Sequence, residues 1–146
     1  MSAVRPSSAV DALLAEARAG MDRVHPHELA AEIAAGALVV DIRPVEQRTR
    51  DGDLPGAVVI DRNVLEWRLD PTCPHRIDAA SELDLRVIVV CNQGFSSSFA
   101  AATLRRLGLH RATDLVGGFQ ALLPQLPAQQ AASRDGSVDG APARTV

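Results

Sequence analysis

The chain contains no lysine, so arginine supplies all of its fixed side-chain positive charge. This absence excludes Schiff-base catalysis by a lysine and the phosphate-binding loop that depends on one. There are 15 arginines against 18 acidic residues, which gives a formal net charge of −3 at pH 7. Because nucleic-acid-binding proteins usually carry a basic patch, we expect no nucleic-acid partner.

Cysteines, aromatic residues and long apolar segments are also few. Two cysteines in 146 residues are too few for a disulfide scaffold, and the lack of an export signal indicates a reducing compartment. Aromatic residues make up 3% of the chain, so Ala, Val, Leu and Ile must fill most of the core. No segment is long enough to span a bilayer, and the first residues lack a signal-peptide pattern. We therefore expect a cytoplasmic protein with no membrane partner.

Short apolar runs rich in β-branched residues alternate with helical patterns along the chain. This alternation predicts an α/β fold, with a central parallel sheet of about five strands covered by helices on both faces. The predicted strands are residues 23–25, 38–42, 57–60, 87–90 and 113–116.

The sequence predicts three parts along the chain. Residues 1–20 form an extension with an amphipathic helix at 9–19, where apolar residues recur at helical spacing. Residues 21–127 form one folded domain, a length that supports a single core. Residues 128–146 are rich in Gln, Ser, Gly, Asp and Pro, and this composition predicts a disordered tail.

Cys91 directly follows the apolar strand 87–90 and precedes a short polar loop and a helix predicted to begin at Ser97. Ligands bind at the carboxyl ends of the strands in open parallel sheets. The N–H groups of the loop and the positive end of the helix dipole would then face the sulfur. We expect Gly94 to permit the tight path, and Ser96 and Ser97 to cap the helix. A cysteine in this position should have a lowered pKa and react as a thiolate.

Four separated motifs together resemble the pattern of one protein family. A strand end reads Asp-x-Arg at Asp41 and Arg43, and a turn at 52–57 reads Gly-Asp-Leu-Pro-Gly-Ala. The loop at Cys91 reads Cys-x-x-Gly-x-x-Ser, and a Val-Gly-Gly-Phe segment follows later in the chain. In this order and spacing the motifs resemble single-domain rhodaneses, the sulfurtransferase family, over roughly residues 23–126.

The resemblance implies a rhodanese-like fold and a two-step transfer of sulfur. The Cys91 thiolate would take the outer sulfur of thiosulfate or of a persulfide donor, and an acceptor would then remove it. The acceptor would be cyanide or a thiol, a protein thiol included. Because the cysteine persulfide is itself the carrier, no cofactor and no metal are expected. The loop residues that would bind the substrate are Asn92, Gln93, Gly94, Phe95, Ser96 and Ser97.

Other residues are assigned to the surroundings of this loop. Asp41 and Arg43 are expected to pair with each other and to support the loop, because buried charges are normally paired. Arg62 follows the second long strand and is expected to add positive potential near the substrate. Cys73 lies in a proline-bracketed loop and is expected to be a structural thiol.

Departures from the family pattern leave alternatives open. Many thiosulfate-using rhodaneses carry Arg just after the cysteine and again five positions after it, where this chain has Asn92 and Ser96. Their absence weakens the expectation of efficient thiosulfate use and leaves a catalytically inactive binding module as the alternative. A phosphatase or arsenate reductase would share the anion-binding loop. Cysteine-dependent phosphatases, however, need Arg six positions after the cysteine, and Ser97 stands there.

Overall fold

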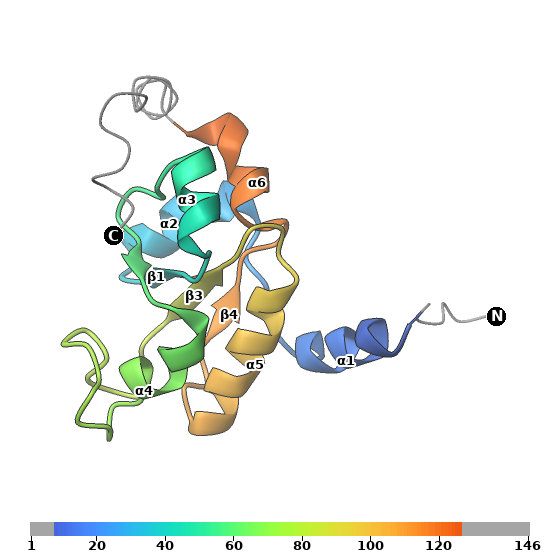
Figure 1. Ribbon diagram of the computed structural model, residues 1–146. Coiled ribbons are helices and arrows are strands. Elements are labelled where there is room, and N and C mark those ends of the chain that lie inside the picture. Colours follow the sequence, from blue (N-terminus) through green and yellow to red (C-terminus); the bar gives the residue numbers. More distant parts are fainter. Residues whose placement is uncertain (1–7, 127–146) are drawn as a thin grey trace.

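Residues 8–126 are described by the computed structural model, and they form an α/β domain around a parallel sheet (Figure 1). The described sheet has four strands in the order β2-β1-β3-β4. The strands are β1 (Leu38–Asp41), β2 (Val58–Val59), β3 (Val87–Val90) and β4 (Thr113–Asp114). The α-helices are α1 (Ala9–Arg18), α2 (Leu29–Ala34), α3 (Val45–Asp51), α4 (Leu65–Leu69), α5 (Ser96–Leu107) and α6 (Gly118–Leu122). Three 3₁₀ turns are η1 (Pro26–Glu28), η2 (Arg62–Val64) and η3 (Leu123–Gln125).

The predicted fold class is confirmed, but the predicted strand at 23–25 is wrong. This segment forms only a single parallel bridge, between Val24 and Leu115, next to β4. The Val24 N–H donates to the Asp114 carbonyl at 3.0 Å. Pro26 then opens a 3₁₀ turn, since its fixed φ and missing N–H suit the start of a helix, and the ladder ends. The described sheet therefore has four strands rather than five.

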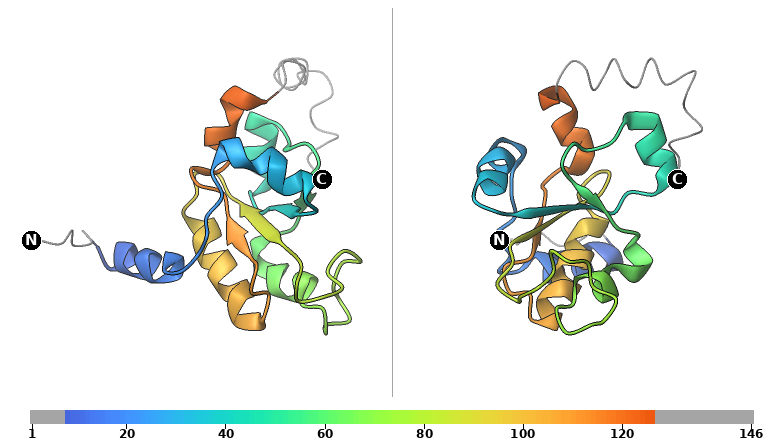
Figure 2. Two further views of the ribbon diagram at one scale, coloured as in Figure 1. Left: turned by 180° about the vertical axis from the view of Figure 1, so that it is seen from behind. Right: turned by 90° about the vertical axis from the view of Figure 1, so that its left-hand side faces the viewer.

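β3 is the centre of the core, because all four of its side chains are fully buried. Successive side chains of a strand point to opposite faces of the sheet. α4 and α5 lie on one side of the sheet, and α2 and α6 lie on the other (Figures 1 and 2). Val87 and Val89 pack with residues of α4 and α5, whereas Ile88 and Val90 pack with residues of α2 and α6. Burying each such side chain contributes roughly 1.5–3 kcal/mol. The residue that follows β3 is therefore attached to the most firmly packed strand of the sheet.

The helix after the Cys91 loop and the N-terminal helix match their predicted positions closely. α5 begins at Ser96, one residue before its predicted start, and ends where Gly108 adopts a left-handed φ of +114°. α1 begins after Ser8, whose side chain caps its first turn, and it projects outward near α5 (Figures 1 and 2). The predicted tail, residues 128–146, lies outside the described residues. Between residues 8 and 126, no helix has both the length and the apolar character needed to cross a membrane.

Candidate active site

Cys91 lies at the carboxyl edge of the sheet, directly after β3, and is 6% exposed. β1 ends beside it, because Asp41 is paired in register with Val90. A pocket of about 280 Å³ lies at this edge and gives a small molecule access to the cysteine. The pocket is lined by Ile42, Arg43, Pro44, Gln47, Cys91, Asn92, Gln93, Phe95 and Ser96.

Hydrogen-bonding groups of the loop and of the first turn of α5 approach the Cys91 sulfur. The Gly94 N–H donates to Sγ at 3.1 Å, and the Ser97 N–H donates to it at 3.4 Å. The Ser97 hydroxyl lies 3.2 Å from Sγ. The prediction that Ser96 and Ser97 cap α5 is wrong, because the N-cap residue is Phe95 and no serine side chain makes a capping hydrogen bond. The sulfur occupies that place and receives a first-turn N–H, where the helix dipole favours negative charge.

The protonation of Cys91 is set by two opposing effects. Burial raises the pKa of the Cys91 thiol, because a buried environment disfavours the charged thiolate. Hydrogen bonds from the Ser97 hydroxyl and N–H, the Ser96 hydroxyl and the Gly94 N–H lower it. These hydrogen bonds outweigh burial, so the pKa of Cys91 lies below that of an ordinary cysteine. The thiolate, which is the nucleophilic form, is therefore populated at lower pH than in a free cysteine.

Two glycines allow the loop to pack tightly against the start of α6. Gly94 has a φ of +85°, and a Cβ there would lie 2.7 Å from the Gly117 nitrogen. Gly118 has a φ of +64°, and a Cβ there would lie 2.6 Å from the Cys91 carbonyl oxygen. Both positions combine a left-handed backbone with contact to other backbone atoms, so neither accepts a side chain without movement. The Cys91 carbonyl also accepts the Phe119 N–H at 2.8 Å, which holds the loop between α5 and α6.

The remaining loop residues differ in whether their polar groups are already paired. The Asn92 side chain accepts a hydrogen bond from Gln120 Nε2 at 2.9 Å, and the same nitrogen donates to Asp51 at 2.9 Å. Asn92 is therefore tied to α6 and α3. Within the described part of the chain, the N–H groups of Gln93 and Phe95 have no acceptor, and both residues line the pocket. These N–H groups are available to a bound anion.

Asp41 and Arg43 form a buried ion pair at the end of β1. Arg43 Nη2 lies 2.8 Å from Asp41 Oδ2 and also donates to the Gly52 carbonyl at 3.0 Å. Among the described residues, Arg43 Nη1 has no hydrogen-bond partner, but the guanidinium carbon lies 3.6 Å from the centre of the Phe119 ring. The ring face stabilises the cation there. Arg43 thus lines the pocket with a charge that Asp41 balances.

A further set of polar residues behind the loop was not predicted from the sequence. Asp114, at the end of β4, is fully buried and accepts hydrogen bonds from the Ser97 and Ser98 hydroxyls, each at 2.7 Å. Arg23 pairs with Asp114 at 2.7 Å. Asp114 could have been predicted from its position, because an acidic residue inside an apolar strand is buried and a buried charge needs a partner. No local pattern marks Arg23 as that partner.

Arg62 was predicted to act together with the loop residues that bind the substrate. It does not line the pocket, and its Nη1 pairs with Glu66, one helical turn later, at 2.9 Å.

Cys73 and Cys91 are both free cysteines. Among the residues that the structure describes, no group of three or more His, Cys, Asp or Glu residues is placed to hold a metal ion.

Comparison with known sequences identifies relatives of one kind. The Rhodanese-like domain family matches residues 25–124. A thiosulfate sulfurtransferase, GlpE of Stutzerimonas stutzeri strain A1501, is 36% identical over 98 residues. That alignment covers 67% of this chain and 81% of the relative.

Solved structures with a similar fold fall largely in the same group. A Rhodopseudomonas palustris protein of unknown function, described as a possible tyrosine phosphatase, has a TM-score of 0.71 at 28% identity, covering 86% of this chain and 96% of that chain. A rhodanese homologue from the extremely thermophilic bacterium Thermus thermophilus has a TM-score of 0.51 at 30% identity, covering 68% and 99%. The human single-domain sulfurtransferase TSTD1 has a TM-score of 0.60 at 24% identity, covering 74% and 100%, a likeness of fold alone.

Proposed function

The chain belongs to the rhodanese-like domain family, and we propose that it is a sulfurtransferase that carries sulfur as a persulfide on Cys91. The observation that supports this most is the approach of the Gly94 and Ser97 N–H groups to Sγ at a strand-loop-helix turn. Such donors lower the pKa of the thiol and stabilise negative charge on the sulfur. The relative GlpE is a thiosulfate sulfurtransferase, which supports the same class of reaction.

In the first step, the Cys91 thiolate attacks the outer sulfur of the donor. A new S–S bond forms at Sγ while the S–S bond of the donor breaks, and the electron pair of that bond leaves with the departing group. The departing group is sulfite from thiosulfate, or a thiolate from a small persulfide. The Cys91 persulfide keeps one negative charge on its outer sulfur. We assign the free N–H groups of Gln93 and Phe95, which line the pocket, to the stabilisation of that charge.

In the second step, a nucleophilic acceptor attacks the outer sulfur of the persulfide. The persulfide S–S bond breaks and its electron pair returns to Sγ, which restores the Cys91 thiolate. Cyanide would leave as thiocyanate, and a thiol would leave as a persulfide. A protein thiol is a suitable acceptor, because Gln93, Phe95 and Ser96 are exposed and line the pocket. We place this reaction in the cytoplasm, where free thiols stay reduced, and it requires no cofactor.

The charges around the pocket bear on the choice of donor. Within the described part of the chain, Arg43 is the one charged residue that lines the pocket, and Asp41 balances it. Asn92 and Ser96 stand where many thiosulfate-using relatives carry arginine. A doubly charged donor such as thiosulfate is therefore attracted only weakly. We propose that small persulfides load Cys91 faster than thiosulfate does.

Two other functions share parts of this site. The absence of arginine at positions 92 and 96 favours a non-catalytic binding module, which remains the alternative. A cysteine-dependent phosphatase would need a bidentate guanidinium six positions after the cysteine. Ser97 occupies that position, and its hydroxyl lies between the sulfur and Asp114. We therefore do not propose a phosphatase, although the Rhodopseudomonas palustris relative is described as a possible one.

Steady-state formation of thiocyanate tests the proposed function. Thiosulfate or a small persulfide is varied at several fixed cyanide concentrations, with Cys91→Ser as the blank and Cys73→Ser as the matched control. Transfer through a covalent intermediate predicts parallel lines in double-reciprocal plots, and Cys73→Ser should keep the parent rate. A rate no higher than that of Cys91→Ser with both donors would contradict the proposal and favour the binding module.

A further inference from the structure

The chain preceding the family match reaches the loop that carries Cys91. α1 and the residues that connect it to Val24 all precede residue 25, where the match begins. α1 has no fully buried residue and projects outward from the domain beside α5 (Figures 1 and 2). Two arginines of this segment, Arg18 and Arg23, nevertheless make part-buried contacts with the loop. A merely peripheral extension would not require such contacts.

Both arginines donate to the same carbonyl oxygen. Arg18 Nη2 lies 2.8 Å from Gly94 O, and Arg23 Nη2 lies 3.1 Å from it. The N–H of Gly94 in turn donates to Cys91 Sγ at 3.1 Å. The Arg18 guanidinium carbon also lies 5.8 Å from the centre of the Phe95 ring. Charge-assisted hydrogen bonds of this kind are stronger than neutral ones, so the two arginines fix the loop at Gly94.

A second connection runs from Arg23 to the sulfur through a buried carboxylate. Arg23 donates to both oxygens of Asp114, at 2.7 and 3.2 Å. Asp114 accepts the Ser97 hydroxyl at 2.7 Å, and the same hydroxyl lies 3.2 Å from Cys91 Sγ. A hydroxyl has one proton, so Ser97 donates it either to Asp114 or to the thiolate. A carboxylate without its arginine would hold that proton more strongly and would repel the thiolate.

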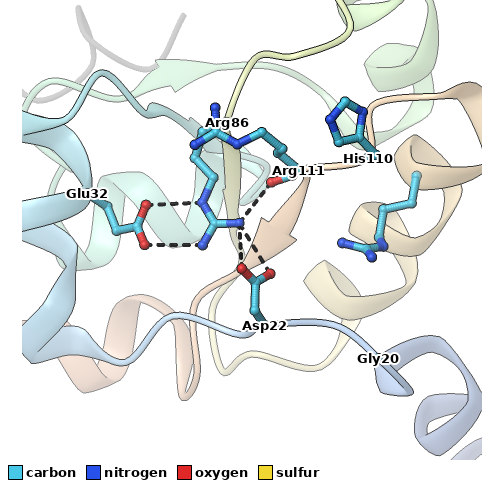
Figure 3. A pocket seen from close by; sticks show the side chains of 7 residues that line it. Gly20, Asp22, Glu32, Arg86, His110 and Arg111 are labelled. Atoms are coloured by element: carbon cyan, nitrogen blue, oxygen red, sulfur yellow. Dashed lines mark hydrogen bonds and ion pairs between the residues drawn. The ribbon is translucent and has the colours of Figure 1, made fainter.

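Arg86 precedes β3, at the end of that strand away from Cys91, and it fixes the segment that connects α1 to Val24 (Figure 3). Its guanidinium lies between two carboxylates, 3.0 Å from Glu32 Oε1 and 3.1 Å from Asp22 Oδ2. It also donates to the Arg111 carbonyl at 3.0 Å. Asp22 immediately precedes Arg23 in the chain, so this pairing restrains the backbone from which the Arg23 side chain reaches Asp114 and Gly94. The extension is therefore held at its base as well as at the loop.

We propose that Arg18 and Arg23 are positioning residues for Cys91. They hold Gly94 against the sulfur, and Arg23 offsets the charge of Asp114 so that the Ser97 hydroxyl serves the thiolate. The catalytic meaning of this inference rests on the proposed function, but its effect on the protonation of Cys91 is measurable without sulfur transfer.

The charged groups around the loop lie on two sides. Arg18, Arg23 and Asp114 face it from the extension and β4, and the Arg43–Asp41 pair lies at the end of β1. Asp51 of α3 accepts a hydrogen bond from the Gln120 side chain, which also bonds Asn92. Burial and the charge of Arg23 lower the pKa of Arg18, whereas the negative charges of Asp114 and Cys91 act in the opposite direction. Arg18 and Cys91 therefore interact electrostatically as well as through Gly94.

The rate at which iodoacetamide alkylates Cys91, measured against pH in full-length Cys73→Ser protein, tests the inference. Arg23→Gln should raise the pKa seen in alkylation and slow the reaction at about pH 7 by roughly threefold to tenfold. Arg18→Gln should act in the same direction but less strongly. Asp114→Asn should lower the pKa, because it removes a negative charge. Arg106→Gln removes an exposed arginine from the last turn of α5 and should leave the profile unchanged.

Opposite shifts in Arg23→Gln and Asp114→Asn are the decisive result, because a merely loosened loop would move both variants in the same direction. Thermal unfolding shows which variants fold. If Arg23→Gln does not fold, the comparison of Arg18→Gln with Asp114→Asn provides the test. The inference would be overturned if the pKa of Cys91 shifted in the same direction in Arg23→Gln and Asp114→Asn. It would also be overturned if the alkylation profiles of both arginine variants were unchanged. The expected shifts without any sulfur loading would support the inference and contradict the proposed function instead.

Discussion

Ser97 contacts the Cys91 sulfur twice, through its N–H at 3.4 Å and through its hydroxyl at 3.2 Å. α5 fixes the direction of the N–H, whereas the hydroxyl proton can rotate between the sulfur and Asp114, 2.7 Å away. The reactivity of the cysteine therefore depends on a helix that the sequence encodes locally and on a carboxylate from a different strand.

Ser97→Ala should raise the pKa of Cys91, because the Ser97 hydroxyl is foremost among the hydrogen bonds that lower it. The thiolate is the charged form, so the reactivity that a lowered pKa provides is lost as pH falls through that pKa. In the variant this loss should occur at higher pH, nearer the ordinary value of about 8.5. Alkylation at about pH 7 should slow by roughly threefold to tenfold, because a smaller fraction of Cys91 is then the thiolate. The exposed Ser81→Ala is the control, and equal profiles for the two variants would refute the role of the hydroxyl.

Ser96→Arg should increase the rate at which thiosulfate loads Cys91, because Ser96 lines the pocket, where Asp41 balances the charge of Arg43. We expect an increase of roughly threefold to tenfold at low ionic strength that declines as salt is added, since salt screens exposed charges. A small persulfide carries less charge and should gain less. Ser81→Arg adds the same charge at an exposed position outside the pocket and should have no effect. Unchanged loading by thiosulfate in Ser96→Arg would show that charge is not the limitation.

Gly94→Ala and Gly56→Ala form a matched pair. Their φ values are +85° and +80°, but a Cβ at Gly56 would meet nothing within 4 Å, whereas one at Gly94 would lie 2.7 Å from the Gly117 nitrogen. Both variants incur the left-handed backbone cost of about 1–2 kcal/mol. Gly94→Ala should lose clearly more stability in urea unfolding and should also load sulfur more slowly. Equal losses of stability, with loading unaffected, would contradict the tight packing of the loop against α6.

The local parts of the site could be predicted from the sequence. The strand at 87–90 is encoded by its own β-branched residues, and α5 is encoded by its own amphipathic pattern. The position of Cys91 between the two elements follows from them. The cap of α5 was predicted wrongly, because the capping rule considers serine side chains near the helix start. It does not consider the Cys91 sulfur, which the loop places next to the Ser97 N–H. Arg62 was expected near the substrate, but it does not line the pocket and pairs with Glu66, four positions later.

The long-range parts could not be predicted. Arg23 and Asp114 are 91 positions apart, and contacts between distant segments, such as the bridge between Val24 and Leu115, bring them together. Arg18 lies in a helix whose amphipathic pattern indicates a surface element, and nothing in that pattern points to Gly94. Charged side chains of this kind are placed by tertiary packing.

The intact mass of the protein after incubation with thiosulfate or a small persulfide tests the central role of Cys91 most directly. The parent and Cys73→Ser should each gain the mass of one sulfur atom and lose it when cyanide is added, whereas Cys91→Ser should gain nothing. A cyanide-sensitive adduct that persists in Cys91→Ser, or no adduct from either donor in the folded parent, would contradict Cys91 as the sulfur carrier.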